Sequence, residues 1–308
     1  MFFRNVTMAR FGQATADTIR TQSFDGTLQD ALAETSLRPV GPQELVSTGF
    51  VPPLGGDSEA MFHAVGDFIW ICLGSESRLL PPAVVHRELA KRLADMEKTQ
   101  GRRPGGRLRK QMKDDLVLEL LPKSHVTPGR TNGYLDLANR IVVVDTPSRK
   151  AAEGFISEVR RALGRFPALM LNAEVAPRSV MTGWIAGDPL PDELLIGEEC
   201  ELKDAQDKGA VVRCQRQDLH SDEIVRHLES GKQVTRLGLT LGERVSFVLG
   251  EDLTLRKLKL LDGAVDSLEE TSDDDLQAEL DARFALMTGE VSGLFKVLEG
   301  SLKVSVVE

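Results

Sequence analysis

Ten basic residues crowd into residues 87–113 of a chain that is otherwise acidic. The protein has 308 residues and a formal net charge of −9. Cations at this density can neutralise the phosphates of a polyanion, and each neutralised phosphate releases condensed counterion, which favours binding without reading base sequence. The alternative is a solvated helix face held by ion pairs between neighbouring turns. Only three acids share the segment, which favours a polyanion partner for Arg87, Lys91, Arg92, Lys98, Arg102, Arg103, Arg107, Arg109, Lys110 and Lys113.

Two helices and a turn have to position these cations. Apolar residues recur at three- and four-residue intervals from Val84 to Met96 and again from Leu108 to Leu120, a spacing that predicts two amphipathic helices. The glycine-rich residues 101–106 interrupt the pattern, and Pro122 ends it. We therefore expect a projecting helical hairpin with an arginine-rich turn.

A second basic surface is expected on a helix at residues 148–163. Thr146 can cap its free N–H groups, and Pro147 suits a first helical position. The cations of this region are Arg149, Lys150, Arg160, Arg161 and Arg165.

One pattern of residues could support catalysis. Asp188 followed by Glu201 and Lys203 resembles the arrangement in which two carboxylates of a nuclease hold Mg²⁺ and a lysine helps to activate water. Such a spacing arises easily in an acidic stretch, so the Mg²⁺-dependent nuclease is kept as the alternative function. Residues 101–108 lack the Lys-Ser/Thr of a phosphate-binding loop, and His220 and His227 have no further ligand at metal-binding spacing. We expect neither an enzyme nor a cofactor.

Composition limits the class of protein and the kind of polyanion. The longest apolar run, residues 68–73, is far shorter than the roughly 20 residues of a membrane helix, and no secretory signal opens the chain. Three widely spaced cysteines read as reduced core thiols, so we expect a cytoplasmic protein without membrane contact. Only 15 residues are aromatic and none lies in 87–113, which favours the backbone of a duplex over the stacked bases of a single strand.

The remaining pattern indicates an α+β fold with mixed antiparallel sheets. The first 76 residues read as strands around one helix at 27–33, with a hairpin at 61–65 and 68–73, and a second hairpin follows at 134–137 and 140–144. The acidic residues 262–281 are expected to form a loop. We predict a central α+β domain from residues 1–78 and 122–172, a basic helical tip inserted at 79–121, and a C-terminal base domain at 173–308.

Five short segments give the chain a recognisable character. Residues 209–219 read GAVVRCQRQDL and are followed by Ser221, His227 and Gly231-Lys232, while residues 49–55 read GFVPPLG. Leu79-Leu80-Pro81, Leu120-Leu121-Pro122 and residues 286–290 (LMTGE) complete the set. In this order they resemble the recombination-associated protein RdgC family of proteobacteria over nearly the whole chain.

The resemblance implies a ring-shaped homodimer that encircles double-stranded DNA without sequence preference, acts in the nucleoid, and limits access of the RecA recombinase. By position it also implies DNA-binding roles for Arg216 and Gln217, which match a Lys-Gln pair, and for Lys232 and Lys123. His125 departs from the family, which has a phenylalanine at one dimer contact. A histidine buries less apolar surface there, so ring closure at this contact is in question. A further alternative is a scaffold whose basic hairpin docks an acidic protein.

Overall fold

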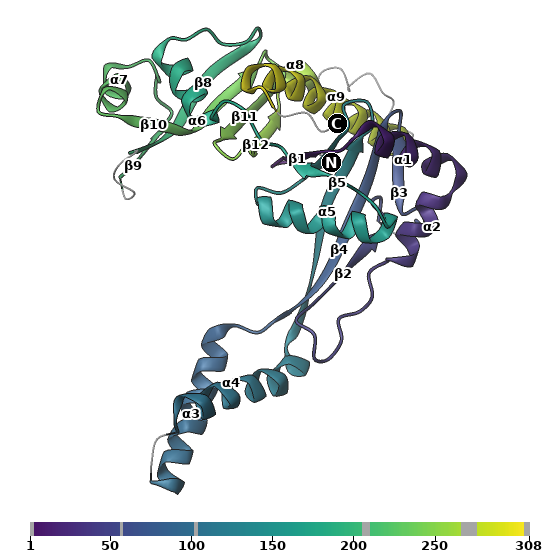
Figure 1. Cartoon of the computed structure of the whole chain (residues 1–308), viewed down its shortest axis with the longest axis vertical. Helices are drawn as coiled ribbons and strands as arrows, with labels where there is room; N and C mark the ends of the chain where they lie inside the picture. The colour runs from purple at the N-terminus through teal and green to yellow at the C-terminus, as the bar shows by residue number, and fades with distance from the viewer. Residues whose placement is uncertain (1–2, 56–57, 102–103, 205–209, 266–275, 305–308) are drawn as a thin grey trace.

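The computed structural model describes residues 3–55, 58–101, 104–204, 210–265 and 276–304. It shows two antiparallel sheets joined through a shared core, with a helical hairpin carried far from both (Figure 1). In chain order the elements are β1 (Thr7–Arg10), α1 (Gln13–Asp25), α2 (Thr27–Glu34), β2 (Val46–Val51), β3 (Phe62–Val65), β4 (Phe68–Leu79), α3 (Pro82–Gln100), α4 (Gly106–Leu120), η1 (Leu121–Lys123), β5 (His125–Asp136), β6 (Ile141–Val144), α5 (Arg149–Leu163), β7 (Leu169–Met170), α6 (Pro177–Ala186), β8 (Leu194–Asp204), β9 (Val211–Gln215), α7 (Asp222–Glu229), β10 (Lys232–Leu241), β11 (Val245–Gly250), β12 (Leu255–Leu260), α8 (Asp262–Val265) and α9 (Leu276–Leu302).

The central sheet has the strand order β2-β4-β5-β6-β1-β7, with β3 paired to β4. Successive side chains of a strand point to opposite faces. Ile69, Leu135 and Val142 therefore pack with the helices α1, α2 and α5 in one hydrophobic core, while Trp70 and Tyr134 pack in another core on the opposite face. The part of the central sheet that carries these residues is thus buried on both faces.

The single helix expected near the N-terminus is wrong, because two helices occupy this region. Gly26 adopts φ +86°, which lets the chain end α1 and start α2 at one residue. The mostly polar sequence of α1, which buries only Ala16 and Ile19, hides its helical period.

A long two-stranded ribbon, here called the stalk, leaves the central sheet. β4 and β5 pair along twelve residues, from Phe68 opposite Asp136 to Leu79 opposite His125. That length corresponds to about 40 Å of extended chain. Only the proximal ends of the two strands are buried, so the distal half is a solvent-exposed ribbon held by its backbone ladder, with β2 along its edge.

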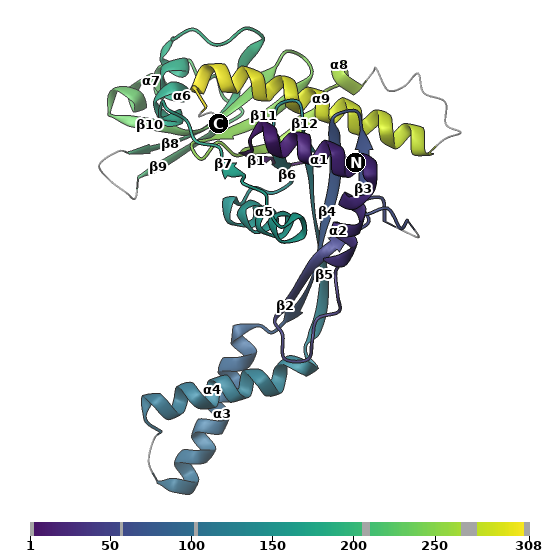
Figure 2. The same ribbon diagram turned by 45° about the vertical axis from the view of Figure 1, so that its right-hand side comes forward.

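The tip consists of α3 and α4 at the end of the stalk (Figure 2). Val85 is the only buried residue recorded for α3 and Leu116 the only one for α4. The accessible surface of the chain is 17,024 Å², whereas a compact monomer of 33.8 kDa exposes about 13,000 Å². The slender arm formed by the stalk and the tip contributes to this excess surface.

The base is built around a second sheet with the strand order β12-β11-β10-β8-β9. The helices α6, α7 and α9 cover one face of it (Figure 2). The core of the base continues into the central sheet, since Phe284 of α9 stacks on Trp70 at 5.6 Å between ring centroids and Arg10 of β1 forms an ion pair with Glu299. The two sheets lie on either side of residue 172, and the proposed domain division stays a prediction.

Two local expectations need correction. The cap of α5 is Ser148, whose hydroxyl accepts a hydrogen bond from the backbone N–H of Ala151 at 3.3 Å, and not Thr146. The acidic residues 262–281 include α8 and the start of α9, although 266–275 lie outside the described part of the chain. No helix in the described residues combines the length and apolar character needed to cross a bilayer.

Candidate nucleic-acid interface

The basic run of residues 87–113 forms the helical tip that the sequence predicts. Arg87, Lys91, Arg92 and Lys98 lie on α3, and Arg107, Arg109, Lys110 and Lys113 lie on α4. Arg102 and Arg103 fall in the connection between the helices, outside the described residues. Pro81-Pro82 starts α3, because proline suits the first helical turn, and Gly101 ends it with φ +69°.

The cations nearest the stalk are paired with carboxylates. Lys91 lies 2.9 Å from Glu88, and Arg87 lies 4.0 Å from the same carboxylate. Arg92 crosses from α3 to Glu119 of α4 at 2.6 Å. A hydrogen bond from Lys91 lowers the pKa of Glu88, and one from Arg92 lowers that of Glu119. These cations are partly neutralised, and they brace the two helices.

The cations farther from the stalk differ in this respect. Among the described residues, no carboxylate pairs with Lys98, Arg107, Arg109, Lys110 or Lys113, although Arg109 lines a crevice beside Glu97. Four of the five lie in the first two turns of α4, which carries no acid in its first turn. The N-terminus of a helix has a partial positive charge, so clustered cations there oppose its stability. This placement favours an anionic ligand over a purely structural role for the distal cations.

Arg78 fixes the junction between stalk and tip, a role that sequence reasoning missed. Its guanidinium donates to the carbonyl oxygens of Gly41 at 3.1 Å and Leu121 at 3.2 Å. The Leu120-Leu121-Pro122 motif thus supplies an acceptor that holds the start of η1 against the end of β4. Lys123, expected to contact DNA, follows directly and lies 3.8 Å from Glu119. A lone arginine in a polar strand gives no sequence signal for such a clamp.

The second expected basic surface lies on α5. Arg149 pairs with Glu153 and Arg161 with Glu158, and the side chain of Arg160 donates to the carbonyl of Phe166. No carboxylate partner is recorded for Lys150 or Arg165 within the described residues. α5 lies between the base and the tip, on the hollow side of the molecule (Figure 1). Among the described residues, this helix therefore has fewer cations without a carboxylate partner than the distal tip has.

The base residues expected to contact DNA lie toward two different ends of the base sheet: Arg216 and Gln217 beside Glu198 of β8, and Lys232 opposite Asp204 at the other end of that strand. Arg216 follows β9 with φ 54°, and Gln217 next to it donates a side-chain hydrogen bond to Glu223 of α7. They directly follow Gln215, the last residue of β9. Lys232 begins β10, and its ammonium group lies 3.0 Å from the Ser230 hydroxyl. Arg216 lines a hollow on the open face of the sheet.

A small apolar patch, formed by Val46 and Leu79, lies beside His125 where the stalk meets the tip. His125 is paired with Leu79 across β4 and β5, and Val46 of β2 is paired with Ser77 of β4. Because Ser77 and Leu79 are two residues apart, Val46, Leu79 and His125 lie on one face. Leu79 is 59% exposed and Val46 53% exposed. Two exposed apolar side chains thus share a face with His125, the residue at the expected dimer contact.

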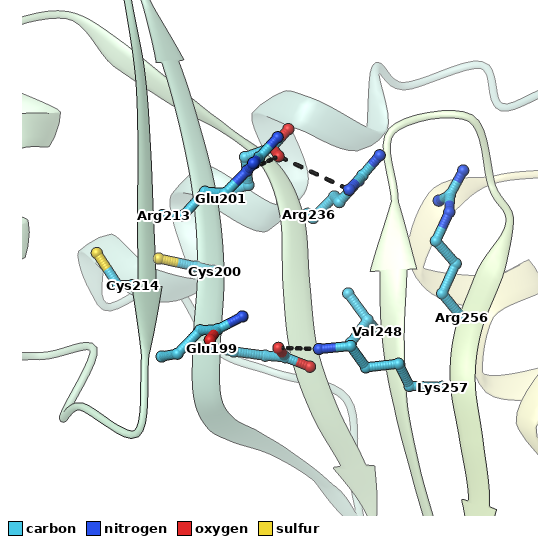
Figure 3. Close-up of a pocket in the computed structure, with 10 residues that line it drawn as sticks. Glu199, Cys200, Glu201, Arg213, Cys214, Arg236, Val248, Arg256 and Lys257 are labelled. Atoms are coloured by element: carbon cyan, nitrogen blue, oxygen red, sulfur yellow. Dashed lines mark hydrogen bonds and ion pairs between the residues drawn. The ribbon is translucent and has the colours of Figure 1, made fainter.

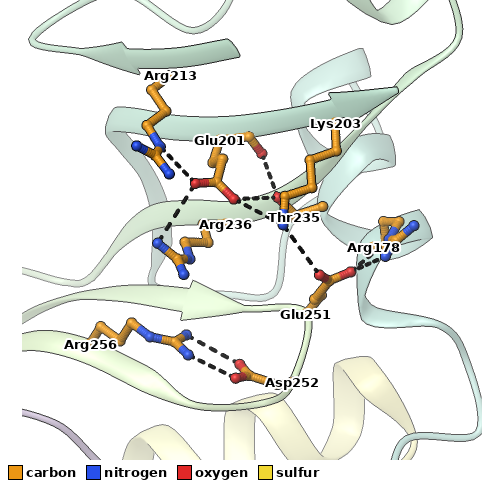
Figure 4. Close-up of polar contacts among 9 residues, drawn as sticks. All are labelled: Arg178, Glu201, Lys203, Arg213, Thr235, Arg236, Glu251, Asp252 and Arg256. Atoms are coloured by element: carbon orange, nitrogen blue, oxygen red, sulfur yellow. Dashed lines mark hydrogen bonds and ion pairs between the residues drawn. The ribbon is translucent and has the colours of Figure 1, made fainter. Parts of the chain in front are cut away.

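The residues of the nuclease pattern do not form a metal site. Glu201 is buried on β8, and its carboxylate accepts from Arg213 at 2.9 Å and from Thr235 at 3.1 Å (Figure 4). Lys203 lies 3.4 Å from the same carboxylate, so it neutralises Glu201 rather than activating water. Asp188 instead follows the end of α6, where its backbone N–H bonds to Gly183.

The electrostatics of Glu201 agree with this structural role. Burial raises its pKa, but hydrogen bonds from Arg213 and Thr235 and the charge of Arg236 outweigh burial and lower the pKa below its ordinary value. In the described part of the chain, no group of three or more His, Cys, Asp or Glu residues could hold a metal ion. The geometry therefore does not favour the Mg²⁺-dependent nuclease.

Comparison with known proteins identifies the family of this chain. Residues 1–305 match the family model described as "Putative exonuclease, RdgC". The chain belongs to the RdgC family. It is 52% identical over 309 residues to the "Recombination-associated protein RdgC" of Xanthomonas axonopodis pv. citri (strain 306) and to that of Xanthomonas campestris pv. campestris (strain B100), with full coverage of both chains in each case. The protein of the same name from Stenotrophomonas maltophilia is 50% identical, over 99% of each chain.

The segments that suggested the RdgC family have structural explanations. Residues 49–55 end β2 in a turn whose carbonyls, at Pro52 and Pro53, accept from Arg130 of the stalk at 2.7 and 3.2 Å. In the LMTGE segment of α9, Met287 is buried and its sulfur accepts from the backbone N–H of Phe3. Both contacts join segments far apart in the chain. These contacts give both motifs a role in the folding of an RdgC chain, and neither motif needs a catalytic role to account for it.

Proposed function

We propose that this protein binds double-stranded DNA without sequence preference and acts in recombination without being an enzyme. Two copies would form a ring around the duplex, in the nucleoid, and limit the access of RecA. The observation that carries the proposal is the set of distal tip cations that have no carboxylate partner among the described residues and lie away from the acidic bulk of the chain. The name of the RdgC relatives supports the link to recombination.

The tip suits the backbone of a duplex better than single-stranded bases. Its helices carry no aromatic residue, and single-strand binders stack bases on exposed rings. Long lysine and arginine side chains on two exposed helices can follow phosphates, which carry no direct sequence information. The described surface of the tip thus offers charge but no platform for stacking.

The patch around His125 supports pairing of two copies. It lies where the stalk meets the tip, so two copies paired through it would meet at their tip ends. Closing a ring would take a second contact, between the base ends of the two copies. A two-fold interface is self-complementary, so one apolar patch is sufficient to supply both sides. His125 is the contact residue of this proposed interface.

Binding of two unrelated duplexes of equal length, measured by fluorescence anisotropy over a range of salt, tests the proposal. We expect both duplexes to give the same steep, linear fall of log affinity with log salt. A complex that is insensitive to salt, or confined to one duplex, refutes it. If no DNA binds at low salt, the basic tip serves an acidic protein instead. RecA-driven strand exchange on the same duplex should slow in proportion to occupancy.

A further inference from the structure

The five strands of the base sheet sort their side chains by character. On β10, Leu237, Leu239 and Leu241 are buried towards the helices, while Arg236 and Thr240 point to the other face. The strand period of two places charged residues of the neighbouring strands on that same open face. It carries Lys203 on β8, Arg213 on β9, Arg236 on β10, and Arg256 and Lys259 on β12. A bulge at Lys257, which has φ 53°, interrupts the period on β12, and Lys257 also lines the hollows of this face.

Two adjoining hollows lie on this open face and together form a trough. Their volumes are about 330 and about 550 Å³. Both are lined by Glu199, Gln215, Val248 and Lys257, so they adjoin each other. Figure 3 shows the residues that line the smaller one. Gly238 contributes to the floor of the larger hollow, where a Cβ would come within 2.9 Å of the Glu199 side chain. The lining residues come from all five strands, so the trough crosses the open face of the sheet.

Cations outnumber acids along the trough. Two arginines, Arg213 and Arg236, share the single carboxylate of Glu201, at 2.9 and 3.7 Å. Their side chains are 70% and 45% exposed, so N–H groups remain available for a ligand. Lys257 is paired with Glu199, and Arg256 with Asp252 at 2.7 Å, whereas Lys259 has no carboxylate partner among the described residues. The residues that line the two hollows include the cations Arg213, Arg216, Arg236, Arg256, Lys257 and Lys259 and the acids Glu198, Glu199 and Glu201.

The trough and the tip lie on the same side of the base sheet. α6, α7 and α9 lie on one side of the base sheet, whereas α5 and the tip hang on its other side (Figure 2). The open face is the one that these three helices leave uncovered. A duplex held in the hollow beside α5 would therefore meet the trough at the base and the distal cations at the tip.

We propose that this trough is a second binding surface for the phosphates of the DNA backbone and that Glu201 is its positioning residue. The proposal rests on the proposed function. Glu201 is buried and tied to Thr235, so it presents a fixed acceptor to Arg213 and Arg236. Arginine binds phosphate through two parallel N–H groups, and a preset guanidinium loses less side-chain freedom on binding.

Salt titration of duplex affinity with the variant Arg236→Gln/Lys259→Gln tests the surface. The slope of log affinity against log salt should fall by about 2 per chain if each residue contacts one phosphate. Lys296→Gln/Lys303→Gln is the matched control, because it also removes two exposed cations. Lys296 lies on α9 and Lys303 directly follows it, on the other side of the base sheet. The control should leave the slope unchanged.

Three outcomes separate this surface from the proposed function. An unchanged slope in Arg236→Gln/Lys259→Gln, with salt-dependent binding by the parent, rejects the trough and leaves duplex binding by the tip intact. Absence of duplex binding by the parent protein rejects both. Acetylation of the unaltered protein gives a check that does not depend on folding of a variant: duplex should protect Lys257 and Lys259 but not Lys296. Equal labelling of all three with and without duplex rejects the trough.

The variant Glu201→Gln separates two roles of Glu201: holding Arg213 and Arg236 in place for phosphate, and repelling DNA by its negative charge. The substitution removes one negative charge, so a purely electrostatic role predicts tighter binding. Positioning predicts the opposite, a loss of about fivefold, which corresponds to one hydrogen bond. In the Arg213→Gln/Arg236→Gln background the same change should have no effect on affinity. Tighter binding by Glu201→Gln, or an equal loss in both backgrounds, refutes the positioning role.

Discussion

The distal and proximal cations of the tip should contribute unequally to DNA binding. Arg107, Lys110 and Lys113 lie at three-residue intervals on α4 and have no carboxylate partner in the described structure. Replacing all three by glutamine should remove up to three phosphate contacts per tip, which lowers the salt slope by about 2.7. Between 50 and 200 mM salt, a slope difference of 2.7 changes the relative affinity about 40-fold.

The matched control is Lys91→Gln/Arg92→Gln/Lys123→Gln, which removes the same formal charge. These three cations already pair with Glu88 or Glu119, and contact with phosphate would require breaking those pairs. We expect the salt slope to stay unchanged, with a modest loss of affinity at low salt because Glu88 and Glu119 become unpaired. Fluorescence anisotropy with one duplex measures both triple variants. Equal slopes for the two variants would refute the distinction between distal and proximal cations.

Three further predictions concern catalysis, stability and assembly. Supercoiled plasmid should show no nicking with Mg²⁺ beyond that with EDTA, and nicking that disappears in Glu201→Ala would contradict this. Glu201→Gln should lower the free energy of unfolding by about 1–2 kcal/mol at neutral pH; because its pKa lies below the ordinary 4.5, the loss should persist above that pH and vanish as the pH falls through the lowered value, as measured by denaturant titration. His125→Phe should tighten and His125→Glu weaken self-association in sedimentation, and equal association of both variants would exclude the patch.

The helical tip could be predicted from sequence, whereas the stalk could not. The apolar period of α3 and α4 and the glycines between them mark a helical hairpin directly. β4 was expected to end at residue 73 and β5 to begin at residue 134, yet they extend to Leu79 and His125. The outer half of β5 is mostly exposed and that of β4 mostly half-buried, and neither shows the alternation of apolar and polar residues that would reveal a strand. Pairing with a partner strand, and not burial, holds these residues in strands.

The charges of the candidate interface were visible in sequence, but their partners were not. Arg92 is neutralised by Glu119, 27 residues later, because two helices lie side by side. Arg213 and Arg236 meet at Glu201 only after three strands have paired. The alternation of charged and apolar residues along β10 and β12 could have indicated a charged sheet face. The register that brings those faces together depends on tertiary structure.

The enclosure of a duplex is tested most directly by comparing nicked circular and linear forms of one plasmid. Protein is bound to each at low salt, washed at high salt, and the retained protein is measured. A ring has no phosphate contacts left at high salt but cannot leave a circle, so we predict retention on the circular form and loss from the linear form. Equal loss from both forms would contradict a closed ring around the DNA.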